Sequence, residues 1–520
     1  MKPQLLSSMK GYKKSDLFHD LMAGLMVAII ALPLSIALGL QSVDPTISTN
    51  GIQYGLITAI VAGFFISALG GSKHQIGGPT AAFVVILFGY FGTLGVLGLA
   101  LAGILAGVLL ILMGVLKLGN VMKFFPYPIT IGFTTGIGVT LLIGQIKDLC
   151  GFTASGTEAI EKLVSYVENI ATFDLATFGV GVLGLACVIL LPKLSKKIPA
   201  AFVALIVCTG ATLLLNNFAG TEIATIGSAY GEVKAGFFPI DFSGIGSLNF
   251  GSLIVPAITI AFLCAIESLL SATVAAGMTG TTFDANQELL GQGVANIGSS
   301  LLGGLPATGA IARTAANIEN GAKSPLAGIF HALFLLVMYF ALMGVLKYIP
   351  LTVFSAILIS VAINMSRFPL FAKLAKFGIR DVIILLVTFA LTVIFDLTVG
   401  VLSGIAITFL VNAKNIKTGL TVETFESANE TEENLEAVTL TAKGTLFFLN
   451  ANKLVDAVEQ ALSSAQSVTV DLSAVERIDE TALEKIKSLS KKVQNKGKRV
   501  EFISTNEKVQ ARFDRFFPVL

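Results

Sequence analysis

The chain has 520 residues, of which 54% are hydrophobic and only 13% are charged, and its mean hydropathy is +0.83. A soluble domain carries roughly 25% charged residues, so this composition excludes a wholly soluble protein and indicates a polytopic membrane protein. The formal net charge of +2 is too small to indicate a nucleic-acid partner. The four cysteines lie mostly in apolar runs without paired or metal-like spacing, so we expect free thiols and no disulfides.

Apolar segments recur along the chain as far as Lys417, and about fourteen of them are long enough to cross or partly cross a bilayer. The first seven are expected near 18–40, 53–70, 77–92, 95–116, 127–146, 173–192 and 199–216. The other seven are expected near 252–276, 288–303, 306–319, 324–345, 350–366, 381–396 and 398–414. The third and tenth segments are short, as half-helices are.

Two pairs of similar motifs indicate an internal duplication. Gly77–Ala82 reads GGPTAA and resembles Gly303–Thr308, which reads GGLPAT. Val121–Pro126 resembles Val345–Pro350, and the two pairs have nearly the same spacing along the chain and the same order. Because seven spans is an odd number, the second half must begin on the opposite side of the membrane, so a seven-plus-seven duplication is inverted.

The stretch around Gly303–Ile318 reads GGLPATGAIARTAANI, with helix-breaking residues followed by small residues at the start of a helix. The first four N–H groups of a helix have no intrahelical partner and carry roughly half a positive charge, so such an end binds anions. Broken helices are tolerated in a membrane only where they line a cavity or are buried in protein. The alternative is ordinary packing of small residues between helices. We expect one anion site built from both repeats: Pro79, Thr80 and Ala81 from one, and Ala310 and Ile311 from the other.

Three polar residues could complete this site. Arg313 is the only basic residue of the tenth segment, and it could add positive potential, pair with Glu267, or reach toward an interface. Glu267 is the only carboxylate of the eighth segment, and Ser271 lies four residues later on the same helix face, which favours a cation or proton site. The alternative for Glu267 is an ion pair with Arg313 that joins the two segments.

Ser35 follows Pro33, a residue that kinks the first segment and frees a backbone carbonyl. Its hydroxyl could line the anion site or bond to its own helix backbone. His74 and His331 could relay protons, but a packing role is the stronger interpretation.

Loop charges predict that both ends of the chain lie in the cytoplasm, because basic residues accumulate on that side. Four lysines, Lys147, Lys162, Lys234 and Lys347, are expected outside. The basic residues expected on the cytoplasmic side are Lys2, Lys10, Lys13, Lys14, Lys117, Lys123, Lys193, Lys196, Lys197, Arg367, Lys373, Lys376, Arg380, Lys414 and Lys417.

The composition changes after about Lys417. Residues 418–436 are acidic and polar and are interpreted as a linker, and residues 437–520 alternate like a small soluble α/β domain. The expected strands are Ala437–Thr441, Thr445–Leu449, Val468–Leu472 and Arg499–Ile503, and the expected helices are Ala451–Ser463, Glu480–Val493 and Thr505–Phe516.

The chain resembles the SulP family of inorganic anion transporters over nearly its whole length, and its tail resembles a STAS domain. The motifs that carry the resemblance are GGPT at Gly77–Thr80, AIESLLS at Ala265–Ser271, NQELLGQG at Asn286–Gly293, GGLPATGAIARTAANI at Gly303–Ile318 and GAKSPLAG at Gly321–Gly328. The resemblance implies a transmembrane domain over residues 1–417. In it, a core (spans 1–4 and 8–11) moves against a gate (spans 5–7 and 12–14), often within a homodimer in a bacterial inner membrane.

The resemblance also implies roles for single residues. In the sodium-coupled bicarbonate branch, an acid and a hydroxyl at the positions of Glu267 and Ser271, with backbone near Gly309 and Ala310, bind sodium. Many sulfate-type relatives have a glutamine where this chain has Leu34, which slightly favours a smaller anion. Signalling STAS domains have a phosphorylatable serine where Glu480 stands, although Thr481 follows it.

We therefore expect an all-α membrane domain of fourteen spans, arranged as inverted repeats with two half-helices, plus a small cytoplasmic α/β domain. The expected function is secondary transport of a small inorganic anion, bicarbonate or sulfate, coupled to sodium or protons by an elevator movement. Alternatives are a nucleobase–cation symporter of the same fold, an anion channel or exchanger, and a membrane-anchored signalling protein. The sequence has no nucleotide-binding loop, zinc-type spacing or nucleophile elbow, so we expect that the protein is not an enzyme. We expect no cofactor, unless a sodium ion binds at Glu267 and Ser271.

Overall fold

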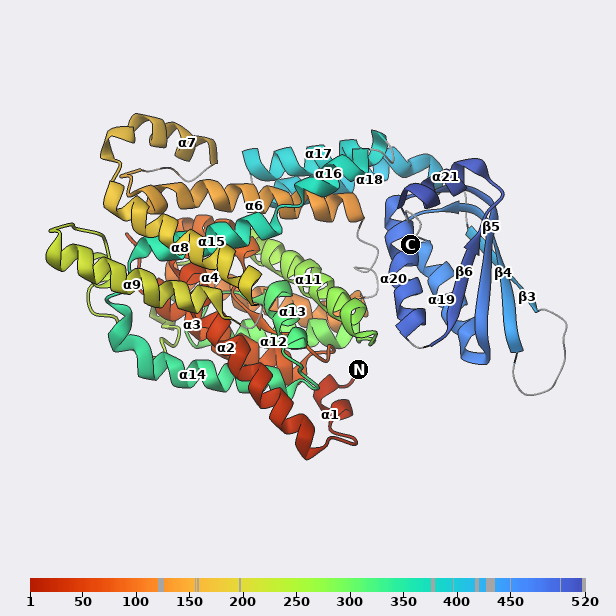
Figure 1. The fold of residues 1–520 in the computed structure, drawn as a ribbon, viewed down its shortest axis with the longest axis horizontal. Coiled ribbons are helices and arrows are strands. Elements are labelled where there is room, and N and C mark those ends of the chain that lie inside the picture. Colours follow the sequence, from red (N-terminus) through yellow and green to blue (C-terminus); the bar gives the residue numbers. More distant parts are fainter. Residues whose placement is uncertain are drawn as a thin grey trace.

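Two parts of the chain differ sharply in architecture in this computed structural model: a large helical part and a small α/β part (Figure 1). The structure describes residues 1–119, 126–154, 156, 159–195, 198–375, 379–395, 397–416, 420–426, 435–448, 450–495 and 497–516. Several residues used above lie outside these ranges: Lys123, Lys196, Lys197, Lys376, Lys417 and most of the motif Val121–Pro126.

The helical part contains long apolar helices joined by short loops. Its longer helices in the first half are α2 (Lys14–Ser42), α3 (Gly51–Leu69), α4 (Ala81–Val115), α6 (Tyr127–Cys150), α8 (Leu175–Leu194) and α9 (Ala200–Phe218). In the second half they are α11 (Gly251–Thr279), α12 (Ala285–Leu301), α14 (Leu326–Leu346), α15 (Leu351–Met365), α17 (Ile379–Ile394) and α18 (Leu397–Ile416). Shorter helices are α1 (Gln4–Ser8), α7 (Ala159–Glu168), α10 (Ile226–Tyr230), α13 (Ile311–Glu319) and α16 (Phe368–Ala375).

Each expected apolar segment overlaps one of these helices or one arm of α4. Helix α4 is interrupted at Gly95, whose φ of 67° and ψ of −171° divide it into the two arms expected as separate segments. Among the described residues, nine helices have the length and apolar composition needed to cross a membrane. The two half-helices are shorter than expected, because 77–80 and 306–310 are extended rather than helical.

The long helices pack as two groups. Helices α2, α3, α4, α11, α12 and α14 make their largest interfaces with one another, and α13 packs on α11 and α2. Helices α6, α8, α9, α15, α17 and α18 form the second group. These are the helices assigned above to the core and to the gate. The groups meet mainly where α2 packs on α15 and α9, in a cluster that includes Leu32, Leu205 and Val353.

The small domain is a four-stranded sheet with helices beside it, at one end of the molecule in Figure 1. The strand order is β3 (Leu420–Glu426), β4 (Leu435–Leu446), β5 (Ala465–Ile478), β6 (Arg499–Ile503), with β3 antiparallel and the other neighbours parallel. Its helices are α19 (Ala451–Ser464), α20 (Glu480–Asn495) and α21 (Glu507–Phe516).

Two sequence-based expectations for this domain were wrong in detail. Leu420–Glu426, inside the expected linker, is an edge strand, because it is rich in β-branched and aromatic residues and pairs with β4 along its whole length. The strand expected at 437–441 and the start of the one expected at 445–449 belong to one strand, β4, which continues through Gly444 with register shifts against β5 and ends at Leu446; Leu449 lies outside the described residues.

Candidate functional site

The two duplicated motifs meet at a short antiparallel pairing in the middle of the helical part. Gly77 and Gly78 form β1, Thr308 and Gly309 form β2, and the register pairs Gly77 with Gly309 and Gly78 with Thr308. We call this pairing of β1 with β2 the crossing. Because the paired strands run in opposite directions, the helices that follow them, α4 and α13, also leave the crossing in opposite directions. This is the arrangement that an inverted repeat with two half-helices requires.

Both half-helices begin without a capping side chain. Thr80 is the N-cap residue of α4 and Ala310 is the N-cap residue of α13, and neither accepts a side-chain cap hydrogen bond. Both residues are buried, with 7% exposure each, and so is Ala81. The Ala310 N–H donates to the Ile76 carbonyl at 2.8 Å, so in this state it is engaged and not available to an anion. The first N–H groups of the helices that follow Thr80 and Ala310 have no intrahelical partner, so the two helix ends form a buried region where a negative charge is favoured.

The Thr80 hydroxyl donates a hydrogen bond to the Glu267 carboxylate, with Oγ1 2.9 Å from Oε2. This bond joins the N-terminus of α4 to the middle of α11 and brings the candidate anion ligand and the candidate coupling carboxylate into direct contact. Hydroxyl groups have one donor hydrogen, so in this state Thr80 donates to Glu267.

Arg313, in the first turn of α13, lies next to the crossing and is 1% exposed. Its Nη2 donates to Ser35 Oγ at 3.2 Å and to the Pro79 carbonyl at 3.3 Å. Within the described ranges, none of the ion pairs involves Arg313, and its Nε and Nη1 have no hydrogen-bond partner. The expected alternative, an ion pair between Arg313 and Glu267, is therefore wrong for this state, because Glu267 bonds to Thr80.

Two of the expected site hydroxyls are engaged elsewhere. Ser35 donates to the Ala31 carbonyl at 2.7 Å, so its backbone-bonded alternative is correct, and it touches the site only through Arg313. Ser271 donates to Thr314 Oγ1 at 3.3 Å rather than joining Glu267. The residues expected to share a sodium ion thus face different partners here.

Sequence reasoning missed a set of buried polar residues that hold β1 and β2 in place. Ser268 Oγ accepts from the Gly309 N–H at 3.0 Å and bonds to Thr308 Oγ1 at 2.8 Å. Gln75 donates to the Ser268 carbonyl at 3.0 Å, and Thr314 Oγ1 accepts from the Ile76 N–H at 3.0 Å. Ser268 was within reach of sequence analysis, because it follows Glu267 in the motif AIESLLS.

Glycine is required at two positions of the crossing because other groups approach closely, and Gly78 also has a φ of 150°, which L side chains rarely adopt. A Cβ on Gly309 would overlap the Gln75 amide, and a Cβ on Gly78 would overlap the Arg313 guanidinium. Any other residue would push these polar groups away from the backbone that they position.

Two further carboxylates anchor the loops that lead to and from the crossing. Glu288 accepts from the Gly71 and Ser72 N–H groups at 2.9 and 3.0 Å. Asp20 accepts from the Lys323 and Ser324 N–H groups at 2.5 and 3.0 Å. Both carboxylates are fully buried, so their hydrogen bonds hold the loop before β1 and the loop after α13 firmly in place.

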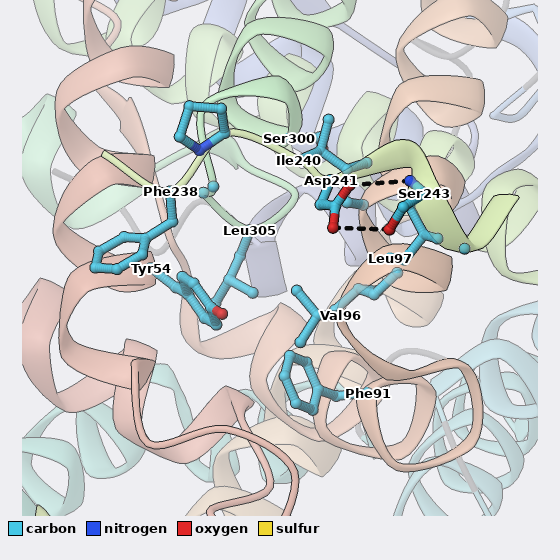
Figure 2. Close-up of a pocket in the computed structure, with 16 residues that line it drawn as sticks. Tyr54, Phe91, Val96, Leu97, Phe238, Ile240, Asp241, Ser243, Ser300 and Leu305 are labelled. Atoms are coloured by element: carbon cyan, nitrogen blue, oxygen red, sulfur yellow. Dashed lines mark hydrogen bonds between the residues drawn. The ribbon is translucent and has the colours of Figure 1, made fainter. Parts of the chain in front are cut away.

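A cavity of about 410 Å³ lies elsewhere, between the start of α3, the part of α4 around its break at Gly95 and the chain near Asp241 (Figure 2). Tyr54, Phe91 and Phe238 supply much of its apolar lining, and Asp241 bonds to Ser243 at its edge. None of the expected site residues lines it. The stretch that leads to β2 contributes Ser300, Gly303, Gly304 and Leu305 to the lining of this cavity, which we do not assign to the anion.

The comparison with protein families decides which family this architecture represents. The model of the sulfate permease family matches residues 17–388, and the STAS domain model matches residues 428–516. The chain belongs to the sulfate permease family. The permease match contains the complete crossing and every residue that positions it, and the STAS match covers most of the small α/β domain, which confirms that assignment.

Relatives of this permease include sulfate transporters and bicarbonate transporters. A putative sulfate transporter, YvdB of Bacillus subtilis, is 40% identical over 77% of this chain and 74% of its own length. The bicarbonate transporter BicA of Picosynechococcus is 30% identical over 81% of this chain and 74% of its own.

Solved structures agree with the fold. The transmembrane domain of a cyanobacterial bicarbonate transporter, BicA, matches with a TM-score of 0.67 and 27% identity over 75% of this chain and 98% of its own. The structure of SLC26A9 matches with a TM-score of 0.71 at 18% identity over 99% of this chain and 89% of its own, which supports the fold alone.

Proposed function

We propose that this permease is a secondary active transporter of a small inorganic anion, bicarbonate or sulfate. The observation that carries the proposal is the β1–β2 crossing, which brings two uncapped helix N-termini together beside an arginine without a carboxylate partner in the described chain. Two helix-end half-charges and one guanidinium favour an anion without a mobile lysine in the site. The names of the relatives, a putative sulfate transporter and a bicarbonate transporter, are consistent with either substrate.

The contact between Thr80 and Glu267 suggests how a cation would be coupled to the anion. When Glu267 is charged, it accepts the hydrogen bond from the Thr80 hydroxyl, so this hydroxyl cannot donate to the anion. A proton or a sodium ion at Glu267 would neutralise the carboxylate and release the hydroxyl toward the anion. Cation and anion would therefore bind together, which is symport, with Thr80 as the shared group.

Alternating access would come from movement of the first helix group against the second, as an elevator. The pairing holds the two half-helix starts together within the first group, so the site would travel with that group as one unit. Both chain ends would lie in the cytoplasm, and two copies would form a homodimer in a bacterial inner membrane.

The test is uptake into proteoliposomes from a panel of labelled sulfate, bicarbonate, chloride and nucleobase, with and without sodium and across pH. Saturable uptake of one anion that requires a sodium or proton gradient supports the proposal. Uptake of a nucleobase, or unsaturable anion flux, would reject it in favour of the symporter or channel alternative.

Two Glu267 variants separate coupling from binding. Glu267→Gln keeps the size of the side chain and cannot be ionised, so uptake should lose its dependence on sodium and pH while some anion exchange remains. Glu267→Ala also removes the partner of Thr80. Unchanged dependence on the cation in both variants would exclude the coupling role.

Removal of the chain beyond about Leu420 tests the signalling alternative. Uptake should remain in the shortened chain if the membrane domain is a transporter and the small domain is not the functional part.

A further inference from the structure

The chain from Met1 to Met22 forms a segment, here called the basic strap, that lies against the first helix group. Within it, the Gln4 N–H donates to the Gly70 carbonyl at 2.9 Å, and the Tyr12 hydroxyl donates to Asp20 Oδ2 at 2.7 Å. Gly70 precedes the loop that leads to β1, and Asp20 holds the loop that follows α13. The strap therefore joins the loops of both half-helix segments on one side of the molecule.

The strap carries a net positive charge, with four lysines against two carboxylates, and its N-terminal ammonium pairs with Asp284 at 3.9 Å. Lys2, Lys10, Lys13 and Lys14 are all exposed, and none of them forms an ion pair within the described part of the chain. The strap's two carboxylates are already engaged: Asp16 accepts from the Lys13 N–H, and Asp20 is fully buried in its own hydrogen bonds.

Large apolar side chains alternate with these lysines on the surface. Phe18 is 65% exposed, Leu6 61%, Leu17 42% and Met22 40%. Phe18 and Met22 are four residues apart on α2, so they share a face of the helix. Since α2 is long and apolar enough to span a membrane, its first turns lie where a membrane meets water.

We propose that the basic strap binds the headgroups of anionic phospholipids in the cytoplasmic leaflet. Exposed lysines next to exposed aromatic and aliphatic side chains are the signature of an interfacial segment that takes both an anionic headgroup and part of the acyl region. An acidic protein or a nucleic acid would satisfy the lysines but would leave Phe18, Leu17 and Met22 without an apolar partner. The inference uses the proposed orientation but does not depend on transport.

The chain contains no tryptophan, so a single tryptophan is an unambiguous probe of the lipids beside it. The variant Phe18→Trp is reconstituted in two mixtures of phosphatidylglycerol and phosphatidylcholine with the same lipid ratio. In one mixture only phosphatidylglycerol is brominated, and in the other only phosphatidylcholine is brominated. We expect quenching to report anionic lipid enriched at Phe18→Trp by about threefold or more over the bulk ratio, because each basic residue near a surface attracts anionic lipid.

Removing the charge separates headgroup binding from simple contact with lipid. Lys10→Gln, Lys13→Gln and Lys14→Gln combined should bring the enrichment close to one. The matched control replaces Lys453, Lys491 and Lys508 by Gln; these exposed lysines belong to the small domain and should leave the enrichment unchanged. Excess inorganic phosphate, at constant ionic strength, should also leave it unchanged.

Three outcomes would overturn the proposal. Quenching by the two brominated lipids in proportion to their bulk ratio would show that the strap does not select anionic headgroups. Enrichment that survives the triple strap variant would place selection on other residues. Loss of enrichment with inorganic phosphate would show a site for free phosphate instead. None of these results depends on uptake, so a failure here leaves the proposed transport function untouched.

Discussion

Thr80 on the N-terminus of α4 donates its hydroxyl hydrogen to Glu267 on α11, across 2.9 Å. The two residues are 187 positions apart in the chain and come from different halves of the duplication. The anion ligand and the coupling group of the proposed mechanism are therefore one hydrogen-bonded unit, and a change in either should affect both substrates.

Replacing Thr80 tests this unit. Thr80→Val keeps the shape of the side chain and removes the donor, which leaves Glu267 without its hydrogen bond. In the proposed mechanism the anion receives this hydrogen bond once Glu267 is neutralised. Because a hydrogen bond to a charged group contributes about 1.5–3 kcal/mol, we expect anion uptake to fall roughly 10- to 100-fold. Initial rates should be measured against both anion and cation concentration.

Thr80→Ser retains the hydroxyl and is the matched control for this change. It should keep most of the uptake and the same cation dependence. If Thr80→Val altered the anion KM but left the cation dependence as in the natural chain, the two residues would not act together.

Arg313→Gln should weaken anion uptake without harming expression. The guanidinium has no carboxylate partner in the described residues, so its removal leaves no unpaired buried acid and relieves the cost of a buried charge. Loss of one full positive charge behind the crossing should raise the anion KM by roughly tenfold, or about 1.4 kcal/mol. The measurement is the uptake KM in proteoliposomes at matched protein content.

Ser35→Ala is the control for Arg313. It removes one acceptor of the guanidinium but leaves the Pro79 carbonyl in contact and the charge in place. Uptake kinetics for Arg313→Gln that match those of the natural chain would rule out an electrostatic role for this residue.

The location of the crossing was predictable from the sequence, but its register was not. The motif comparison aligns Gly77 with Gly303, whereas the two N-cap residues, Thr80 and Ala310, are spaced slightly further apart along the chain. Short glycine-rich motifs specify that a helix breaks, and the helix starts where tertiary contacts such as Ser268 with Gly309 fix the backbone. The second motif pair predicted helix starts more accurately than the first. Helices α6 and α15 begin directly after Pro126 and Pro350, the last residues of the two motifs.

Side-chain partners could not be predicted from one chain. Periodicity placed Glu267 and Ser271 on one face of α11, yet they bond to residues of α4 and α13 respectively. Which hydroxyl reaches which partner depends on how helices from the two repeats pack, and spacing within one helix contains no information on that packing. The small domain was easier to predict, because alternating strands and amphipathic helices have local sequence patterns. Its strand β6, for example, has the expected bounds.

The two helix groups are joined at the end of α2 by a hydrogen bond from Gln41 Nε2 to Asp148 Oδ2 on α6, at 3.1 Å. If the groups move apart during transport, this bond must break. Gln41→Ala should therefore increase amide hydrogen exchange at the ends of α2 and α6 by roughly 2- to 10-fold, the equivalent of one ordinary hydrogen bond.

A mutant cycle shows whether the two side chains act as a pair. Asp148→Ala should have the same effect as Gln41→Ala, and the double variant should add nothing further. Asp148→Asn keeps an acceptor oxygen and should resemble the natural chain. Additive effects in the double variant would show that the pair does not link the helix groups.

The small domain docks on the helical part through Thr481 at the start of α20. Thr481 Oγ1 accepts from the Tyr127 N–H at 3.0 Å, so it satisfies one of the free N–H groups at the start of α6. Thr481→Val should speed hydrogen exchange at the start of α6 about 3- to 30-fold, whereas Thr481→Ser should not. Thr481 is only 6% exposed, so its phosphorylation would require the domains to separate first, and unchanged exchange in Thr481→Val would reject the docking role.

Glu480, next to Thr481, should make the stability of this domain depend on pH. It is fully buried, and burial together with the facing Asp381 carboxyl raises its pKa far above the ordinary value of 4.5. The folded chain therefore keeps a proton that the unfolded chain releases above about pH 4.5, so stability is greatest at low pH and falls as pH rises toward the folded pKa. The slope is at most about 1.4 kcal/mol per pH unit for one group.

Glu480→Gln removes this proton without changing the size of the side chain. Its unfolding midpoint in detergent should exceed that of the natural chain at pH 8, and the difference should shrink toward pH 5. Glu476→Gln changes an exposed carboxylate of the same domain and should leave the pH profile as it is. If the unfolding midpoints of Glu480→Gln and the natural chain ran parallel across this pH range, Glu480 would not hold its proton in the folded domain. The raised pKa would then be wrong.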